Sequence, residues 1–137
     1  MNLLKMYTPS INRIYGDKLS NLRESFQAML LTMDSVQTLF EGPAPSAAEV
    51  ESKLSMLIGS VYRHFENEVR HMQQHNYYDI ETHMDKHAVF IEKVEAFRFN
   101  FPDKKSEENF VAYRLLQRWV TSHLLWDDAH LVQTITS

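Results

Sequence analysis

Most of the seven histidines of this 137-residue chain lie close together between Arg63 and His87. His83 and His87 are four residues apart, and Glu68 follows His64 at the same spacing. Residues at i and i+4 project from one face of a helix, so each pair could share a metal ion or a pair of metal ions. Imidazole and carboxylate ligands suit iron, manganese, cobalt or zinc, and the sequence therefore predicts a metal site.

A further set of candidate ligands lies near the carboxyl end of the chain, in the run WVTSHLLWDD. His123 is followed by Asp127 after four residues and by Asp128 after five. Ideal helix pitch favours Asp127 on the face of His123, whereas a local widening toward i→i+5 pitch would bring Asp128 onto that face. The spacing alone leaves both aspartates open.

Pairs of histidines or acids at i and i+4 also arise by chance on exposed helix faces. The position of each histidine relative to the apolar stripe therefore helps to separate candidate ligands from surface residues. His64 falls in register with Leu54, Ile58 and Val61, on the apolar stripe that must face the core. A buried ionisable group needs a partner, which favours a metal or carboxylate at this position.

The remaining histidines are predicted to bind no metal. His71 lies two turns from His64, about 10.5 Å along the axis, which is too far to reach the same ion, and we expect it to make a hydrogen bond at the edge of the core. His75 and His130 are interpreted as solvated or capping residues.

Four helical segments are predicted to position these residues. An apolar stripe with steps of three and four predicts a first helix from Ser10 to Phe40. The break EGPAPS and a capping box at Ser46 and Glu49 predict a second helix to about Gln74. After HNYY, Asp79 is a plausible N-cap for a third helix to about Phe99, and Ser106 is the expected cap of a fourth that reaches about Val132.

These segments predict an all-α fold, an antiparallel up-down-up-down four-helix bundle in one domain over residues 1–137, in which ligands hang from facing helices. The residues expected to be mainly buried are Leu19, Leu22, Phe26, Met29, Met33, Ile58, Val61, Phe90, Val94, Leu116 and Trp119.

Composition excludes several classes of site and partner. The formal charge of −4 provides no basic field for nucleic acid or an anionic membrane surface. The absence of cysteine excludes disulfides and thiolate metal sites, and it suits a reducing compartment. No run approaches the ~18 apolar residues of a membrane span, and MNLLKMYTPS is too weakly apolar for a signal peptide. We therefore expect a cytoplasmic protein.

Three runs together resemble the hemerythrin family, particularly its single-domain bacterial members. They are HFENE from His64, HMDKH from His83, and WVTSHLLWDD around His123. The resemblance covers about Arg63 to Asp128 and implies a four-helix bundle with a non-haem di-iron pair that binds dioxygen reversibly.

Carried over by position, the resemblance implies the role of each candidate ligand. His83, His87 and His123 would bind one iron, His64 would bind the second, and Glu68 and Asp128 would bridge the two. Phe65, Trp119 and Val120 are candidates for an apolar wall around the bound ligand, and ordinary core packing is an alternative role that is compatible with it.

The first predicted helix departs from the family pattern, because it has no histidine where the family has a further ligand to the second iron. Phe26 falls at that place, and Asp34 falls where the family usually has asparagine. Glu24 lies about 200° around the helix from Phe26 and should point to water. Ser25 is a poor iron ligand but could hold a water on the metal. The resemblance therefore implies an incomplete and partly occupied second iron site.

Three classes of function follow. The first is dioxygen binding for storage, delivery or sensing. The second is redox catalysis, or reaction with peroxide or nitric oxide, at the open coordination position. The third is a bundle with a structural metal or a protein partner.

Overall fold

The computed structural model describes residues 2–137 of the chain and is all-helical. Met1, the first residue of the predicted domain, lies outside the described residues. No β-strand occurs within residues 2–137. The elements in chain order are α1 (Leu3–Tyr15), α2 (Ser20–Gln37), the 3₁₀ turn η1 (Thr38–Phe40), α3 (Ala47–Gln74), α4 (Ile80–Asn100), the 3₁₀ turn η2 (Phe101–Asp103), α5 (Ser106–Ser122), the π-helical segment η3 (His123–Asp128) and α6 (Ala129–Thr136).

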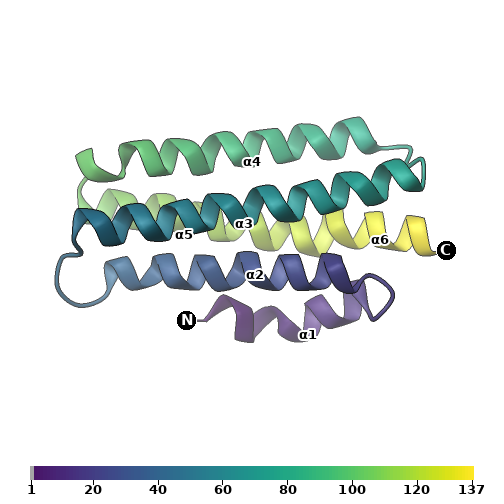
Figure 1. The fold of residues 1–137 in the computed structure, drawn as a ribbon, viewed down its shortest axis with the longest axis horizontal. Coiled ribbons are helices and arrows are strands. Elements are labelled where there is room, and N and C mark those ends of the chain that lie inside the picture. The colour runs from purple at the N-terminus through teal and green to yellow at the C-terminus, as the bar shows by residue number, and fades with distance from the viewer. Residues whose placement is uncertain (1) are drawn as a thin grey trace.

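The long helices lie lengthwise beside one another, and the chain reverses direction at each connection between them (Figure 1). α2 packs against α3, α3 against α4, and α4 against α5. α5, η3 and α6 follow one another as one continuous helical segment. The shorter α1 lies beside α2 and also contacts η3 and α6.

The single first helix predicted from Ser10 to Phe40 is wrong, because the chain turns between Tyr15 and Ser20. Gly16 has a φ of +61°, a left-handed conformation that glycine adopts without steric cost. Arg23 of α2 donates a hydrogen bond from Nη1 to the Gly16 carbonyl oxygen at 2.9 Å. The apolar pattern is therefore divided between two helices that pack together.

Side chains cap the unexpected helix α1 at its amino end. The Asn2 side chain accepts a hydrogen bond from the Lys5 amide, and the Asp34 carboxylate accepts from the amides of Leu3 at 2.7 Å and Leu4 at 3.0 Å. These acceptors satisfy amides that have no partner within the helix. Asp34 thus fixes α1 against α2.

The second predicted helix and the predicted N-cap of α4 are confirmed, whereas the N-cap of α5 is corrected. Ser46 Oγ accepts from the Glu49 amide at 3.1 Å, and α3 ends at Gln74. Asp79 is the N-cap of α4, although its side chain makes no capping hydrogen bond within the described residues. Lys105, rather than Ser106, is the N-cap of α5, since the Glu108 carboxylate accepts from the Lys105 amide. The helical segment then continues past Val132 to Thr136.

The predicted core is buried with two exceptions. Ile58 and Trp119 are only partly buried and pack against the core from its edge. Trp119 stacks on Phe90 with ring centroids 4.2 Å apart, so its large ring contacts the core although one part stays accessible. The fully or nearly fully buried members are Leu19, Leu22, Phe26, Met29, Met33, Val61, Phe90, Val94 and Leu116.

None of the helices within residues 2–137 combines the length and the apolar character that crossing a membrane would require.

Candidate metal centre

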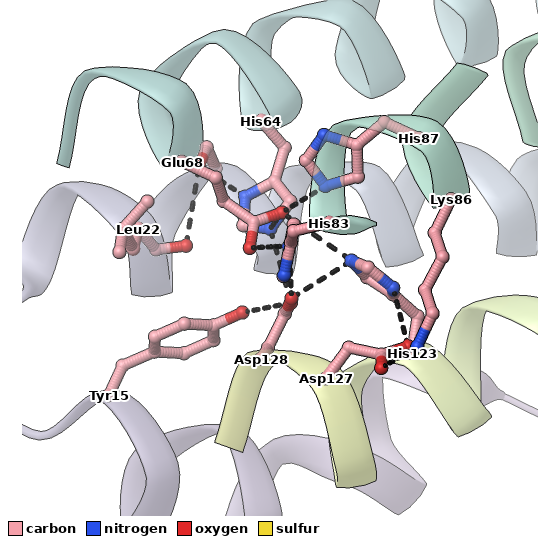
Figure 2. A network of polar contacts seen from close by, with 11 residues as sticks. Tyr15, Leu22, His64, Glu68, His83, Lys86, His87, His123, Asp127 and Asp128 are labelled. Atoms are coloured by element: carbon pink, nitrogen blue, oxygen red, sulfur yellow. Dashed lines mark hydrogen bonds and ion pairs between the residues drawn. The ribbon is translucent and has the colours of Figure 1, made fainter. Parts of the chain in front are cut away.

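The six predicted ligands converge in the interior from three helical segments (Figure 2). α3 provides His64 and Glu68, α4 provides His83 and His87, and η3 provides His123 and Asp128. All six side chains are buried, and the exposed fraction is 0% for His64, Glu68 and Asp128. The i,i+4 spacing on α3 and α4 places each pair on the inward face of its helix.

Four of these residues form a first group, which consists of Glu68, His83, His87 and His123, with ligand atoms all within 4.8 Å of one another. The Nε2 atoms of His83 and His87 each lie 3.2 Å from a Glu68 carboxylate oxygen, and His123 Nε2 lies 3.8 Å from Glu68 Oε1. Three imidazoles and one carboxylate thus face a common point.

A second group consists of His64, Glu68 and Asp128, also with ligand atoms within 4.8 Å of one another. His64 Nε2 lies 3.3 Å from Glu68 Oε1 and 3.6 Å from Asp128 Oδ2. The other oxygen of Asp128, Oδ1, lies 2.9 Å from His123 Nε2. Glu68 belongs to both groups, and Asp128 lies between them with one oxygen toward each.

The donor atoms in these groups fit a metal better than they fit one another. Within residues 2–137, the buried Nε2 atoms of His64, His87 and His123, with Glu68 Oε1 and Asp128 Oδ1, have no hydrogen-bond partner. Most of the nitrogen–oxygen separations exceed the ~2.8 Å of a charge-assisted hydrogen bond. Ligands that share an ion at about 2.1 Å are ~3.0 to 3.4 Å apart, which is close to most of the separations found here.

The π-helical segment η3 explains how two consecutive aspartates serve His123. Asp128 faces the cluster, whereas Asp127 Oδ2 lies 3.0 Å from His123 Nδ1 on the other side of the ring. The widened pitch predicted as the condition for Asp128 is present over His123–Asp128. That Asp128 bridges two metals stays a prediction.

Hydrogen bonds fix the ring orientation of two histidines. His123 Nδ1 donates to Asp127, which leaves Nε2 for the cluster. Ser25 Oγ lies 3.2 Å from the Leu22 carbonyl oxygen and 2.7 Å from His64 Nδ1. When Ser25 Oγ accepts from His64 Nδ1, the neutral ring presents an unprotonated Nε2, as metal-ligating histidines require.

Without a metal, protons on the histidines balance the buried carboxylates. Burial lowers the pKa of His64, but the nearby Glu68 and Asp128 carboxylates outweigh it and raise that pKa to about 9. Burial is likewise outweighed at His83, whose pKa the Asp128 and Glu68 carboxylates raise to about 9. The Asp128 charge likewise raises the pKa of His123 above its ordinary value. At His87 burial prevails and lowers the pKa.

Aromatic rings enclose the cluster on the side of the predicted wall. Phe65 stacks on His87 with ring centroids 3.7 Å apart, and Trp119 stacks on His123 at 4.7 Å. Val120 is buried in the same core. These contacts cover one side of the cluster and restrict the two imidazole rings.

Phe26, Glu24 and Ser25, which lie near the place of the absent histidine in sequence, differ in burial and in contacts. Phe26 is fully buried and meets the His64 ring edge-on at 5.0 Å, whereas Glu24 is exposed as expected. Ser25 contacts His64 rather than the cluster centre. Tyr15 was missed by the sequence interpretation: its hydroxyl donates to Asp128 Oδ2 at 2.7 Å. No signal in the sequence identified it, because its position depends on the turn at Gly16.

The other three histidines lie outside the two groups. His71 Nε2 pairs with Asn21 Oδ1 at 3.0 Å, in agreement with the expected hydrogen bond. His75 Nδ1 lies 2.8 Å from the His71 carbonyl oxygen, and His130 pairs with the Tyr78 hydroxyl. His75 and His130 are exposed.

A surface hollow of about 180 Å³ reaches the cluster beside His83. Lys86 and Asp127 line it and form an ion pair, and exposed Trp126 lies at its edge. A larger hollow of about 660 Å³ lies around η1, η2 and the start of α3, and none of the predicted ligands lines it.

The buried histidine, glutamate and aspartate cluster could hold a metal ion. Comparisons of the chain with family models, with curated proteins and with solved structures found no match to any of them.

Proposed function

We propose that this chain is a non-haem di-iron protein of the hemerythrin type that binds dioxygen in the core of an antiparallel four-helix bundle. The observation that carries the proposal is the convergence of two ligand groups that share Glu68, with buried donor atoms that lack hydrogen-bond partners within residues 2–137. The resemblance of the three sequence runs selects iron among the metals that such ligands accept.

The two groups define two metal positions. His83, His87 and His123 would hold the first metal, His64 would hold the second, and Glu68 and Asp128 would be shared by both. An iron pair at these positions would supply two electrons to one dioxygen molecule. Phe65 and Trp119 cover one side of this region, and Asp127 holds the His123 ring in the orientation that presents Nε2.

The second position has one nitrogen ligand where the first has three. Phe26 fills the space beside His64 that a further histidine would use, so the second metal should bind more weakly and leave first. This asymmetry should give partial occupancy or rapid autoxidation in the protein as it exists.

Metal analysis of protein purified without added metal tests the proposal. We expect iron at between one and two atoms per chain, and a new visible absorption band when anaerobically reduced protein meets air. A reversible band that disappears on deoxygenation supports dioxygen binding. Protein that holds no metal and keeps its stability when iron is offered would contradict the proposal.

A second candidate function is redox catalysis, in which peroxide or nitric oxide reacts at the second position. The incomplete ligand set favours it, because catalytic metal sites keep an open coordination position. The surface hollow of about 180 Å³ lies beside His83 of the first group, and none of His64, Glu68 and Asp128 lines it. Sustained consumption of peroxide, with no stable oxygenated band, would favour this function over storage or delivery.

A further inference from the structure

Tyr15 places a buried phenol against the candidate metal centre, although it lies far from every other member in sequence. Its side chain is 3% exposed, and its hydroxyl donates to Asp128 Oδ2 at 2.7 Å (Figure 2). A buried tyrosine hydroxyl needs an acceptor, and any carbonyl oxygen would meet that need. Here the acceptor is instead the carboxylate that lies between the two ligand groups.

The hydrogen bond distinguishes the two oxygens of Asp128. Oδ1 lies 2.9 Å from His123 Nε2 and 3.5 Å from His83 Nε2, both in the first group. Oδ2 lies 3.6 Å from His64 Nε2 in the second group and accepts from Tyr15. A donor fixed on Oδ2 prevents the carboxylate from rotating, so that each oxygen keeps facing its own group.

The α1 helix is held so that Tyr15 reaches this place. Tyr15 is the last residue of α1, next to the turn at Gly16, whose carbonyl oxygen accepts from Arg23. The phenol ring contacts Phe26 at a centroid distance of 6.0 Å and meets the His64 ring edge-on at 6.2 Å. Tyr15 thus lies beside the two residues that define the incomplete second position.

We propose that Tyr15 is a positioning residue for the second metal position, where it orients Asp128 and takes over part of the support that the absent histidine would give. This inference rests on the proposed metal centre. Tyr15 acts through Asp128 and not as a ligand itself, because its hydroxyl proton points to a carboxylate oxygen. Partners that orient ligands in this way typically change metal affinity by roughly 10- to 100-fold when removed.

The test compares Tyr15→Phe with Tyr113→Phe in iron-loaded protein. Tyr113 is the matched control, since it is also fully buried and donates one hydrogen bond, from its hydroxyl to the Met33 carbonyl oxygen at 2.6 Å. Tyr15→Phe keeps the ring that packs against Phe26, and circular dichroism checks that both variants retain their helices. Iron released to a chelator is followed over time, together with the visible spectrum of the ferric protein.

We expect Tyr15→Phe to release the more weakly bound iron roughly 10 to 100 times faster, with a smaller effect on the more tightly bound iron, which three imidazoles hold. Tyr113→Phe should release both irons at the same rates as the parent protein. Equal release from Tyr15→Phe and the parent overturns the inference but leaves the proposed function intact. A visible tyrosinate-to-iron charge-transfer band that Tyr15→Phe abolishes also overturns it, because Tyr15 would then be a ligand. Parent protein that binds no iron overturns both proposals.

Discussion

Asp127 and Asp128 are adjacent in sequence, yet they bind opposite sides of the same imidazole ring. Asp127 Oδ2 lies 3.0 Å from His123 Nδ1, and Asp128 Oδ1 lies 2.9 Å from His123 Nε2. Two neighbours on a regular helix would be about 100° apart, so this arrangement depends on the π-helical pitch of η3. Asp127 orients the His123 ring, and Asp128 lies with the Nε2 atom of that ring inside the candidate metal centre.

Asp127→Asn should weaken metal binding although Asp127 is not a predicted ligand. The amide is a poorer acceptor for His123 Nδ1–H than the carboxylate, so the ring loses orientation and basicity. We expect roughly 10- to 100-fold lower affinity at the first position, measured by competition with a chelator. Asp85→Asn, an exposed change on α4, is the control and should have no effect. Equal affinities for the two variants would exclude the orienting role.

His87→Ala should remove one of the three nitrogens of the first position and abolish most of the metal affinity. It also removes the ring that stacks on Phe65, so the metal-free variant should be checked for helix content. His75→Ala, which changes an exposed histidine outside both groups, should retain metal. Metal analysis after dialysis compares the two, and similar losses in both would contradict the ligand assignment.

Phe26→His should raise the iron content toward two atoms per chain and lengthen the life of an oxygenated state, because it adds a nitrogen beside His64. In the metal-free protein the same change should lower the free energy of unfolding by roughly 1–3 kcal/mol, since it buries a polar ring in an apolar site. Metal analysis and unfolding with and without iron measure both effects. Unchanged iron content would mean that another residue completes the second position.

Metal uptake should release protons, because histidine ligands bind in their neutral form. The pKa values of His64 and His83 are raised to about 9, and that of His123 is also raised, so these rings are protonated near pH 7.5 without metal. We expect about two to three protons released per chain at that pH. Calorimetry in buffers of different ionisation enthalpy counts them, and release of none would contradict the raised pKa values.

The sign of the same shifts predicts how the metal-free protein responds to pH. A folded-state pKa of about 9 against an ordinary value of 6.5 stabilises the fold fully below pH 6.5. That contribution is lost as pH rises through 9. Chemical unfolding of metal-free protein between pH 6 and 10 should show decreasing stability, whereas a rise over that range would contradict it.

The later helices and the paired residues on α3 and α4 could be predicted because they depend on local periodicity, whereas the choice of Asp128 over Asp127 came from the resemblance. The i,i+4 pairs on α3 and α4 and the apolar register of His64 are properties of single helices. The π-helical widening before Asp128 was predicted as the condition under which an aspartate five residues after His123 reaches the same face.

The turn at Gly16 could not be predicted from the same pattern, because the apolar stripe continues across it. Its stability comes from contacts between helices, namely Arg23 with the Gly16 carbonyl and Asp34 with the first amides of α1. Tyr15 follows from that turn, and so its contact with Asp128 was missed. The Ser25 contact with His64 was also missed, since it joins two helices whose rotation the sequence does not specify.

The π-helical segment η3 behaves as a one-residue insertion whose effect stays local. In a regular helix an added residue would rotate everything that follows it by about 100°, whereas the wider turn of a π-helical segment absorbs the extra residue. Leu131 and Val132 of α6 are buried, and α6 contacts α1. A deletion of Leu125 should therefore yield a more regular helix that keeps Asp128, Leu131 and Val132 facing inward, with Asp128 four residues after His123 in place of five. The same deletion brings Asp127 three residues after His123 and should remove its contact with Nδ1, so the extra residue serves the second aspartate rather than the packing of α6.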